Sequence, residues 1–290
     1  MKGSKIMEYS IVLPHSQKKM TLRELLENEW LIPRKVRHFL RIRKNVWRNH
    51  QPIKFHELVY ANDIITLRIE KEDYSYQKVK AGFKEKLNIL YEDEHLIIVN
   101  KAAGIKTHPN QPEETGTLLN DLTAYLAEKN TQPYVVHRLD KETSGAILFA
   151  KNPLVLPILG RLLEKKKIYR YYQAIVWGKL TQNCTIDKKI GRDRHDQRKR
   201  IINEHRGKTA ITYVKVHQAN EQNSKVYCRL ATGRTHQIRV HLASIGHPIV
   251  GDPLYQNKKE KRLALHAYEM QLLHPFTQEQ ITVVANPGLW

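Results

Sequence analysis

The hydrophobic positions near the start of the chain follow first a strand period and then a helix period. Every second residue from Tyr9 to Leu13 is apolar, which is typical of a strand with one buried face. Thr21 and Glu24 have the spacing of a capping box, so we place the start of a helix there. The apolar residues that follow have the spacing of one helix face: Leu22, Leu25, Leu26 and Trp30.

A second helix and a further strand follow. The apolar spacing over Val36, Phe39 and Leu40, after Pro33, predicts the second helix. Asn62-Asp63 is a turn signal, and the next six residues alternate as in a strand. These elements predict a small domain.

The boundaries of this domain follow from composition. The small domain is expected over residues 10–72, because residues 73–86 turn polar and charged, as a linker does. The larger domain is expected over residues 87–290. Its predicted strands do not alternate regularly with its predicted helices, which indicates an α+β fold with a mixed, mostly antiparallel central sheet. The expected strands are 96–99, 146–150, 172–176, 213–216 and 226–230, and the expected helices lie near 117–128 and 153–165.

The charge balance adds a partner to this picture. The chain has 49 Lys and Arg against 29 Asp and Glu, a formal net charge of +20, which attracts polyanions. Nucleic-acid phosphates and anionic membranes are the two candidates. No apolar run approaches the roughly 18–20 residues that span a bilayer, and no secretion signal is visible, so no membrane is expected. From composition alone, a nucleic-acid partner and a basic surface that is only solvated both stay open.

The cysteine and histidine patterns exclude some site classes. The two cysteines, Cys184 and Cys228, lack C-x-x-C spacing, which argues against a disulfide scaffold and fits a reducing cytoplasm. No paired Cys/His spacing or H-E-x-x-H motif occurs, so no metal is expected. A monomer is the default expectation.

Positive charge is concentrated in the second predicted helix. No acidic residue lies between Leu31 and His56. A solvated helix face is one interpretation, but the absence of any counter-charge favours a phosphate-binding patch. The patch consists of Arg34, Lys35, Arg37, Arg41, Arg43 and Lys44.

The most informative carboxylate is Asp140. It stands in a polar segment between an apolar stretch ending at Val136 and the strand that begins at Ala146. An aspartate in such a turn often only binds backbone amides. It can also be a rigidly held reagent, because His137 and Arg138 directly precede it. Local chemistry leaves both interpretations open.

Three further stretches carry residues suited to RNA. Tyr169, Tyr171 and Tyr172 alternate with cations, a combination that stacks on bases and holds phosphates, although it also suits the edge of a core strand. Gly233 opens a predicted helix whose first turn contains Arg234, a surface charge or the partner of a catalytic carboxylate. The basic run 192–200 is either a solvated loop or a further RNA contact.

Together these stretches closely resemble the RluA/RluD-type family of pseudouridine synthases. The family pattern H-R-L-D-x-x-T-S-G, continued to an A-K pair, is matched at 137–151 without a gap. Further family segments are matched at 170–178, 233–242 and 246–255, and the resemblance covers about 87–290. The first domain is similar to the αL-type RNA-binding domain first known from a small-subunit ribosomal protein, with its glycines replaced at Asn49-His50 and at Asn62.

The resemblance implies an activity. Such an enzyme isomerises specific uridines of structured RNA to pseudouridine, here with large-subunit ribosomal RNA as the expected substrate and without a cofactor. Asp140 would be the catalytic aspartate, acting on the sugar, on the base or through a glycal. Arg234 would pair with Asp140, and Tyr172 would stack on the nucleoside or deprotonate it.

The resemblance also implies substrate contacts. His137 and Arg138 would help to open the RNA and to hold the neighbours of the target, and Ile238 would form a wall of the uracil pocket. The alternative is an RNA-binding or ribosome-assembly factor that has kept the fold without the reaction.

Overall fold

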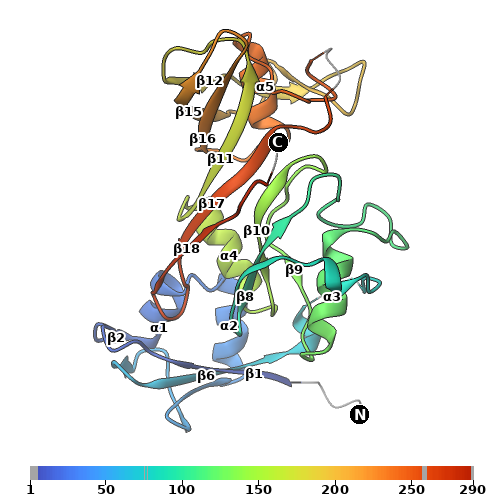
Figure 1. Cartoon of the computed structure of the whole chain (residues 1–290). Helices are drawn as coiled ribbons and strands as arrows, with labels where there is room; N and C mark the ends of the chain where they lie inside the picture. The colour runs from blue at the N-terminus through green and yellow to red at the C-terminus, as the bar shows by residue number, and fades with distance from the viewer. Residues whose placement is uncertain (1–5, 75, 77, 257–259, 289–290) are drawn as a thin grey trace.

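The computed structural model describes residues 6–74, 76, 78–256 and 260–288. Figure 1 shows a small N-terminal part at the bottom and a long sheet that rises from it. The strands β11 (Ile168–Trp177) and β17 (Leu265–Leu273) connect the lower half of this sheet to its upper half. No helix in the described part of the chain is long and apolar enough to cross a membrane.

The N-terminal part is a four-stranded antiparallel sheet with two short helical segments. Its sheet has the order β1-β6-β3-β4, and β2 pairs with β5. The elements are β1 (Ile6–Val12), β2 (Met20–Thr21), α1 (Leu22–Glu24), a π-helix (Leu25–Glu29), α2 (Arg34–Ile42), β3 (Val46–Arg48), β4 (Gln51–Pro52), β5 (Leu58–Val59) and β6 (Ile64–Glu70).

Local chemistry explains these elements. Thr21 caps α1 with the predicted capping box, in which Glu24 returns a bond to the Thr21 backbone. His50 and Asn62 stand where the similar domain has glycine, and they keep the left-handed backbone that glycine favours, with φ of 68° and 65°. The neighbouring Asn49 has φ of 49°. The Asn49 side chain donates to Asp63 at 2.7 Å and accepts from the Ile64 amide at 2.8 Å, which stabilises this conformation.

The large domain is built on one ten-stranded sheet. Its order is β12-β15-β16-β11-β17-β10-β8-β7, with β18 on β17 and β9 on β10. Of the strand pairs in the described residues, β10–β17 is parallel and the others are antiparallel, which confirms the predicted fold class. The remaining elements are 3-10 turns at Lys71–Asp73 and Lys84–Lys86, β7 (Ile89–Glu92), β8 (Leu96–Lys101), α3 (Leu118–Ala127), β9 (Tyr134–Val135), β10 (Ser144–Ala150), α4 (Val155–Glu164), β12 (Cys184–Asp187), β13 (Ile190–Arg192), β14 (Arg200–Ile202), β15 (Ile211–Ala219), β16 (Asn223–Leu230), α5 (Gln237–Ser244) and β18 (Gln280–Val284).

Both faces of the central strands are covered. Every residue of β10 is buried, so it has the continuous apolar pattern of an internal strand instead of an alternating one. Ile147 and Phe149 point into a core with α3, whereas Ala146 and Leu148 point into a core with α4. The second core also contains buried side chains of the N-terminal part.

The N-terminal part therefore packs on the large domain. Trp30 meets Phe276 edge to face, with ring centroids 5.0 Å apart. Arg161 on α4 donates to the carbonyls of Leu31 and Ile32 at 3.1 and 3.4 Å. These contacts between buried groups of the two parts indicate that each part stabilises the other.

The expected linker is also held in place. The Asn120 side chain donates to the Lys80 carbonyl at 2.8 Å, and the Phe83 amide donates to Asp121 at 2.8 Å. Two positions of this segment, residues 75 and 77, lie outside the described residues. The part around Lys80 follows α3 closely, so its polar composition reflects an exposed strap along the large domain. The domain boundaries themselves stay a prediction.

Candidate active site

Asp140 lies in the loop between β9 and β10, and buried polar groups hold this loop from below. The Lys101 ammonium, 1% exposed, donates to the carbonyls of Ala102, Ile105 and Lys141 at 2.7 to 3.0 Å. Burial lowers the pKa of Lys101 to about 8. Thr107 exchanges hydrogen bonds with the backbone of Leu139 at 2.9 and 3.1 Å. The backbone on both sides of Asp140 is thus anchored.

Gly145 explains why this loop can run directly into the sheet. Its φ is +116°, and a Cβ there would lie 2.3 Å from the Ala267 carbonyl oxygen on the parallel strand β17. A side chain at this position would push the two strands apart. The close approach places the loop of Asp140 beside the upper half of the sheet.

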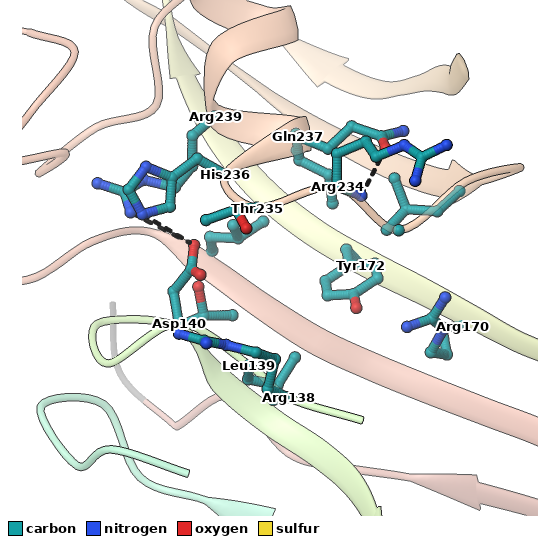
Figure 2. A pocket seen from close by; sticks show the side chains of 15 residues that line it. Arg138, Leu139, Asp140, Arg170, Tyr172, Arg234, Thr235, His236, Gln237 and Arg239 are labelled. Carbon is teal, nitrogen blue, oxygen red and sulfur yellow. Dashed lines mark hydrogen bonds and ion pairs between the residues drawn. The ribbon is translucent and has the colours of Figure 1, made fainter. Parts of the chain in front are cut away.

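The Asp140 carboxylate faces α5. Its Oδ2 lies 3.4 Å from Nη1 of Arg239 and 3.7 Å from Nε2 of His236. Arg239, 3% exposed, is itself held by Asp252, whose carboxylate accepts from Nε at 2.8 Å and from Nη2 at 2.7 Å. Figure 2 shows Arg239 and His236 above the carboxylate. A guanidinium in this position fixes the orientation of the carboxylate.

These contacts correct the expected charge partner. Arg234 lines the same pocket, but its Nε donates to the Thr209 carbonyl at 3.0 Å, and its side chain is exposed. The predicted helix begins later than expected, at Gln237, after His236 in the left-handed conformation with φ 57°. Arg234 therefore belongs to the turn before α5, whereas Arg239 lies inside the helix and points at Asp140.

The pocket beside Asp140 has an apolar wall and a basic rim. Its volume is about 120 Å³. Tyr172 on β11 and Ile238 on α5 are 5% and 4% exposed and line it, and burial raises the pKa of the Tyr172 phenol. Arg138 and Arg170 also line it, and Figure 2 shows the Tyr172 ring near Arg170, across the pocket from Asp140. A flat, uncharged ring fits between such a wall and the carboxylate.

His137 has a different environment from the one expected. Its Nε2 accepts from the Leu148 amide at 3.2 Å, and the residue is not among those that line the pocket. Burial, with a contribution from the nearby Arg170 charge, lowers the pKa of His137 to about 3. The ring is therefore neutral and ties the loop to β10, and of the two expected RNA-opening residues Arg138 is the one at the pocket.

The basic patch on α2 is smaller than expected. Arg37 pairs with Glu27, and Arg43 pairs with Asp73 and Glu70. These acids lie outside the acid-free stretch 31–56, so folding supplies the counter-charges that the local sequence lacks. The exposed cations that remain are Arg34, Lys35, Arg41 and Lys44.

Sequence reasoning missed three residues of the site. Arg239 and His236 stand in the same matched segment as Arg234, and their order in the sequence does not say which of these side chains reaches the carboxylate. Asp252 lies in the matched segment 246–255, and its burial beside an arginine is visible only in the fold.

Comparison with known proteins identifies the family of the chain. The family model described as RNA pseudouridylate synthase matches residues 95–244, across the Asp140 loop and α5. The chain belongs to this family. A second model, described as the RluD ribosomal pseudouridine synthase N-terminal domain, matches residues 9–65. The fold, the family and the isomerase class are thus established for this synthase.

Individual relatives support the assignment. The chain is 47% identical over 253 residues to the uncharacterized RNA pseudouridine synthase YhcT of Bacillus subtilis, covering 82% of each chain. It is 40% identical over 215 residues to the ribosomal large subunit pseudouridine synthase D of Neisseria meningitidis serogroup B, covering 69% of this chain and 58% of that one. The solved structure titled human RNA pseudouridylate synthase domain containing 1 superposes with a TM-score of 0.59 at 28% identity, covering 73% of this chain and 88% of that chain.

Proposed function

We propose that this synthase isomerises specific uridines of large-subunit ribosomal RNA to pseudouridine, with Asp140 as the catalytic carboxylate. The observation that carries the proposal is the position of Asp140. It is an anchored carboxylate held by Arg239 at 3.4 Å, at the edge of a small pocket walled by Tyr172 and Ile238. The name of the Neisseria relative supports the choice of RNA.

The reaction needs few groups. The bond from uracil nitrogen-1 to the ribose anomeric carbon breaks, the base turns, and carbon-5 bonds to the same carbon while its proton leaves and nitrogen-1 gains one. A carboxylate beside an electron-poor sugar carbon can begin this chemistry as a nucleophile or a base. Arg239 orients Asp140 for either role, and the target nucleotide must leave its helix to reach the pocket.

Tyr172 has a narrower role than the sequence allowed. Because burial raises its pKa, the phenol stays protonated at neutral pH. Stacking on the uracil is then favoured over removal of a proton in the resting site. Arg138 and Arg170 at the rim are placed to hold the phosphates of the flipped nucleotide.

Tritium release from RNA labelled at uridine carbon-5 tests the proposal, because the proton at that carbon leaves in the reaction. Asp140→Asn keeps the shape of the side chain and removes its charge, so release should fall to background. Glu142→Gln is the matched control, since it changes a carboxylate of the same loop that does not line the pocket. Release by Asp140→Asn at the wild-type rate would end the assignment of Asp140.

The substrate class needs a separate comparison. Unmodified large-subunit ribosomal RNA and unmodified transfer RNA, both tritiated, should differ in favour of ribosomal RNA. Release from transfer RNA alone would contradict the proposed substrate. Binding of RNA without release from either would instead support the assembly-factor alternative.

A further inference from the structure

A basic basin lies next to the active site. The strands β13 and β14 form a two-stranded hairpin outside the main sheet, and the basin lies between this hairpin and the turn before α5. Its volume is about 470 Å³. It shares Gly233, Arg234 and Thr235 with the pocket of Asp140, so the two hollows adjoin. The cations that line the basin are Arg192, Arg200, Arg206, Lys208 and Arg234.

The charge of this basin is not compensated within the fold. None of its five cations has a carboxylate within ion-pair distance in the described part of the chain. The carboxylates at the hairpin tip, Asp193 and Asp196, have other partners than the cations of the basin. Asp193 accepts from two backbone amides, and Asp196 pairs with Arg198. Several unpaired cations around one hollow repel each other, and a chain of phosphates relieves that repulsion.

A chain of two hydrogen bonds runs from the hairpin through Tyr255 to His236, whose ring lies beside the Asp140 carboxylate. The Arg200 amide on β14 donates to the Tyr255 hydroxyl at 2.8 Å, and this hydroxyl lies 2.9 Å from Nδ1 of His236. Since the hydroxyl accepts from Arg200, its own hydrogen is available for Nδ1. The proton of the neutral His236 ring then sits on Nε2, the nitrogen 3.7 Å from Asp140.

We propose that the β13–β14 hairpin senses RNA: the basin binds backbone phosphates that flank the target uridine, and Tyr255 and His236 transmit the position of the hairpin to Asp140. This inference rests on the proposed function and extends it. His236 and Tyr255 are positioning residues in this scheme, because they act on the substrate through Asp140.

The geometry gives the coupling a physical cause. Arg206 and Lys208 lie on the hairpin side of the basin, and Arg234 lies on the helix side. A phosphate held between these two sides bridges two parts of the fold. Bridging fixes the hairpin against α5, and so fixes the bond from Arg200 to Tyr255. The distance of 3.7 Å from His236 to Asp140 is longer than a hydrogen bond, and the proposed coupling shortens it when RNA binds. Binding of flanking nucleotides would then raise the rate of the chemical step.

The first test concerns the phosphates. The double variant Arg206→Gln and Lys208→Gln should bind a fluorescein-labelled single-stranded RNA more weakly. The slope of log affinity against log salt should flatten by about 0.7 for each lost phosphate contact. Lys215→Gln is the control for loss of a surface cation, one charge against two in the double variant, because Lys215 is exposed on β15 and lies outside the basin. A double variant with the slope of this control would overturn the phosphate site.

The second test concerns the coupling. Tyr255→Phe keeps the ring and removes the hydroxyl, so tritium release should show kcat reduced about tenfold with KM unchanged. Tyr213→Phe on β15, outside the pocket and the basin, is the control and should retain wild-type kinetics. A lower melting temperature with an unchanged kcat would reduce Tyr255 to a structural role and overturn the coupling.

The two proposals fail in different ways. A wild-type protein that releases no tritium refutes the proposed function, whereas the salt slope needs no activity and still reports on the basin. An active wild type with unchanged slopes and an unchanged kcat in the Tyr255 variant refutes the hairpin alone.

Discussion

Arg239 and Arg234 stand five residues apart, and replacing each by lysine separates their roles. Arg239 makes two bonds to Asp252, at 2.7 and 2.8 Å, and one contact to Asp140 at 3.4 Å. The planar guanidinium reaches both carboxylates at once, whereas a lysine ammonium is a single point that cannot. We therefore expect Arg239→Lys to leave Asp140 without its orienting partner.

The expected magnitudes follow from this geometry. A displacement of about 1 Å in a catalytic group costs on the order of 100-fold in rate, so kcat of Arg239→Lys should fall about that much. Loss of the paired bonds to buried Asp252 should also lower the free energy of unfolding by about 1–3 kcal/mol. Arg234 is exposed and makes one bond to the Thr209 carbonyl, so Arg234→Lys should change stability by about 0.5 kcal/mol or less and retain most of kcat.

The assay is single-turnover tritium release on the same RNA for both variants, together with urea unfolding. Single turnover isolates the chemical step from product release. An Arg234→Lys variant that loses as much rate as Arg239→Lys would refute the reasoning from contacts and restore the sequence-based pairing. So would an Arg239→Lys variant with full kcat.

Two further predictions concern the N-terminal patch and the loop histidine. Replacing Arg34, Arg41 and Lys44 together by glutamine should flatten the salt dependence of RNA binding without changing the melting temperature, because all three are exposed; a wild-type slope would remove α2 from the RNA surface. In the folded protein the pKa of His137 is lowered from its ordinary value of 6.5 to about 3. As the pH falls below about 6.5, the unfolded chain therefore takes up a proton that the folded protein does not, and the free energy of unfolding decreases. Between pH 7 and 5 the wild type should lose about 2 kcal/mol more unfolding free energy than His137→Gln, and parallel pH profiles from chemical denaturation would contradict this.

Much of the fold could be predicted from periodicity and caps. The helix cap at Thr21, the strand around Leu148 and the mixed sheet follow from local patterns, because burial on one face or both leaves a readable spacing. The strap around Lys80 could not be predicted in this way. Its polar residues are typical of a linker, and its attachment to α3 depends on Asn120 and Asp121, which are distant in sequence.

Charge pairing was predicted less well, for the same reason. Arg37 and Arg43 looked uncompensated because their partners lie outside the local acid-free stretch. Lys101 is a lysine at the end of a strand, and nothing local indicates that it is 1% exposed and satisfied by three carbonyls. A sequence identifies which charged groups are available, whereas the topology decides which of them meet.

The contacts around Asp140 differ from those of the hairpin proposed to bind RNA. From below, Lys101 and Thr107 anchor the loop to the sheet through buried bonds. From above, Arg239 is held by the buried Asp252, so neither side can shift without breaking a buried ion pair or hydrogen bond. The β13–β14 hairpin pairs outside the main sheet and carries unpaired cations. A substrate that is itself a chain of phosphates can therefore bind this hairpin directly, and in the proposed scheme the hydrogen bond to Tyr255 passes the position of the hairpin to a carboxylate whose other contacts stay in place.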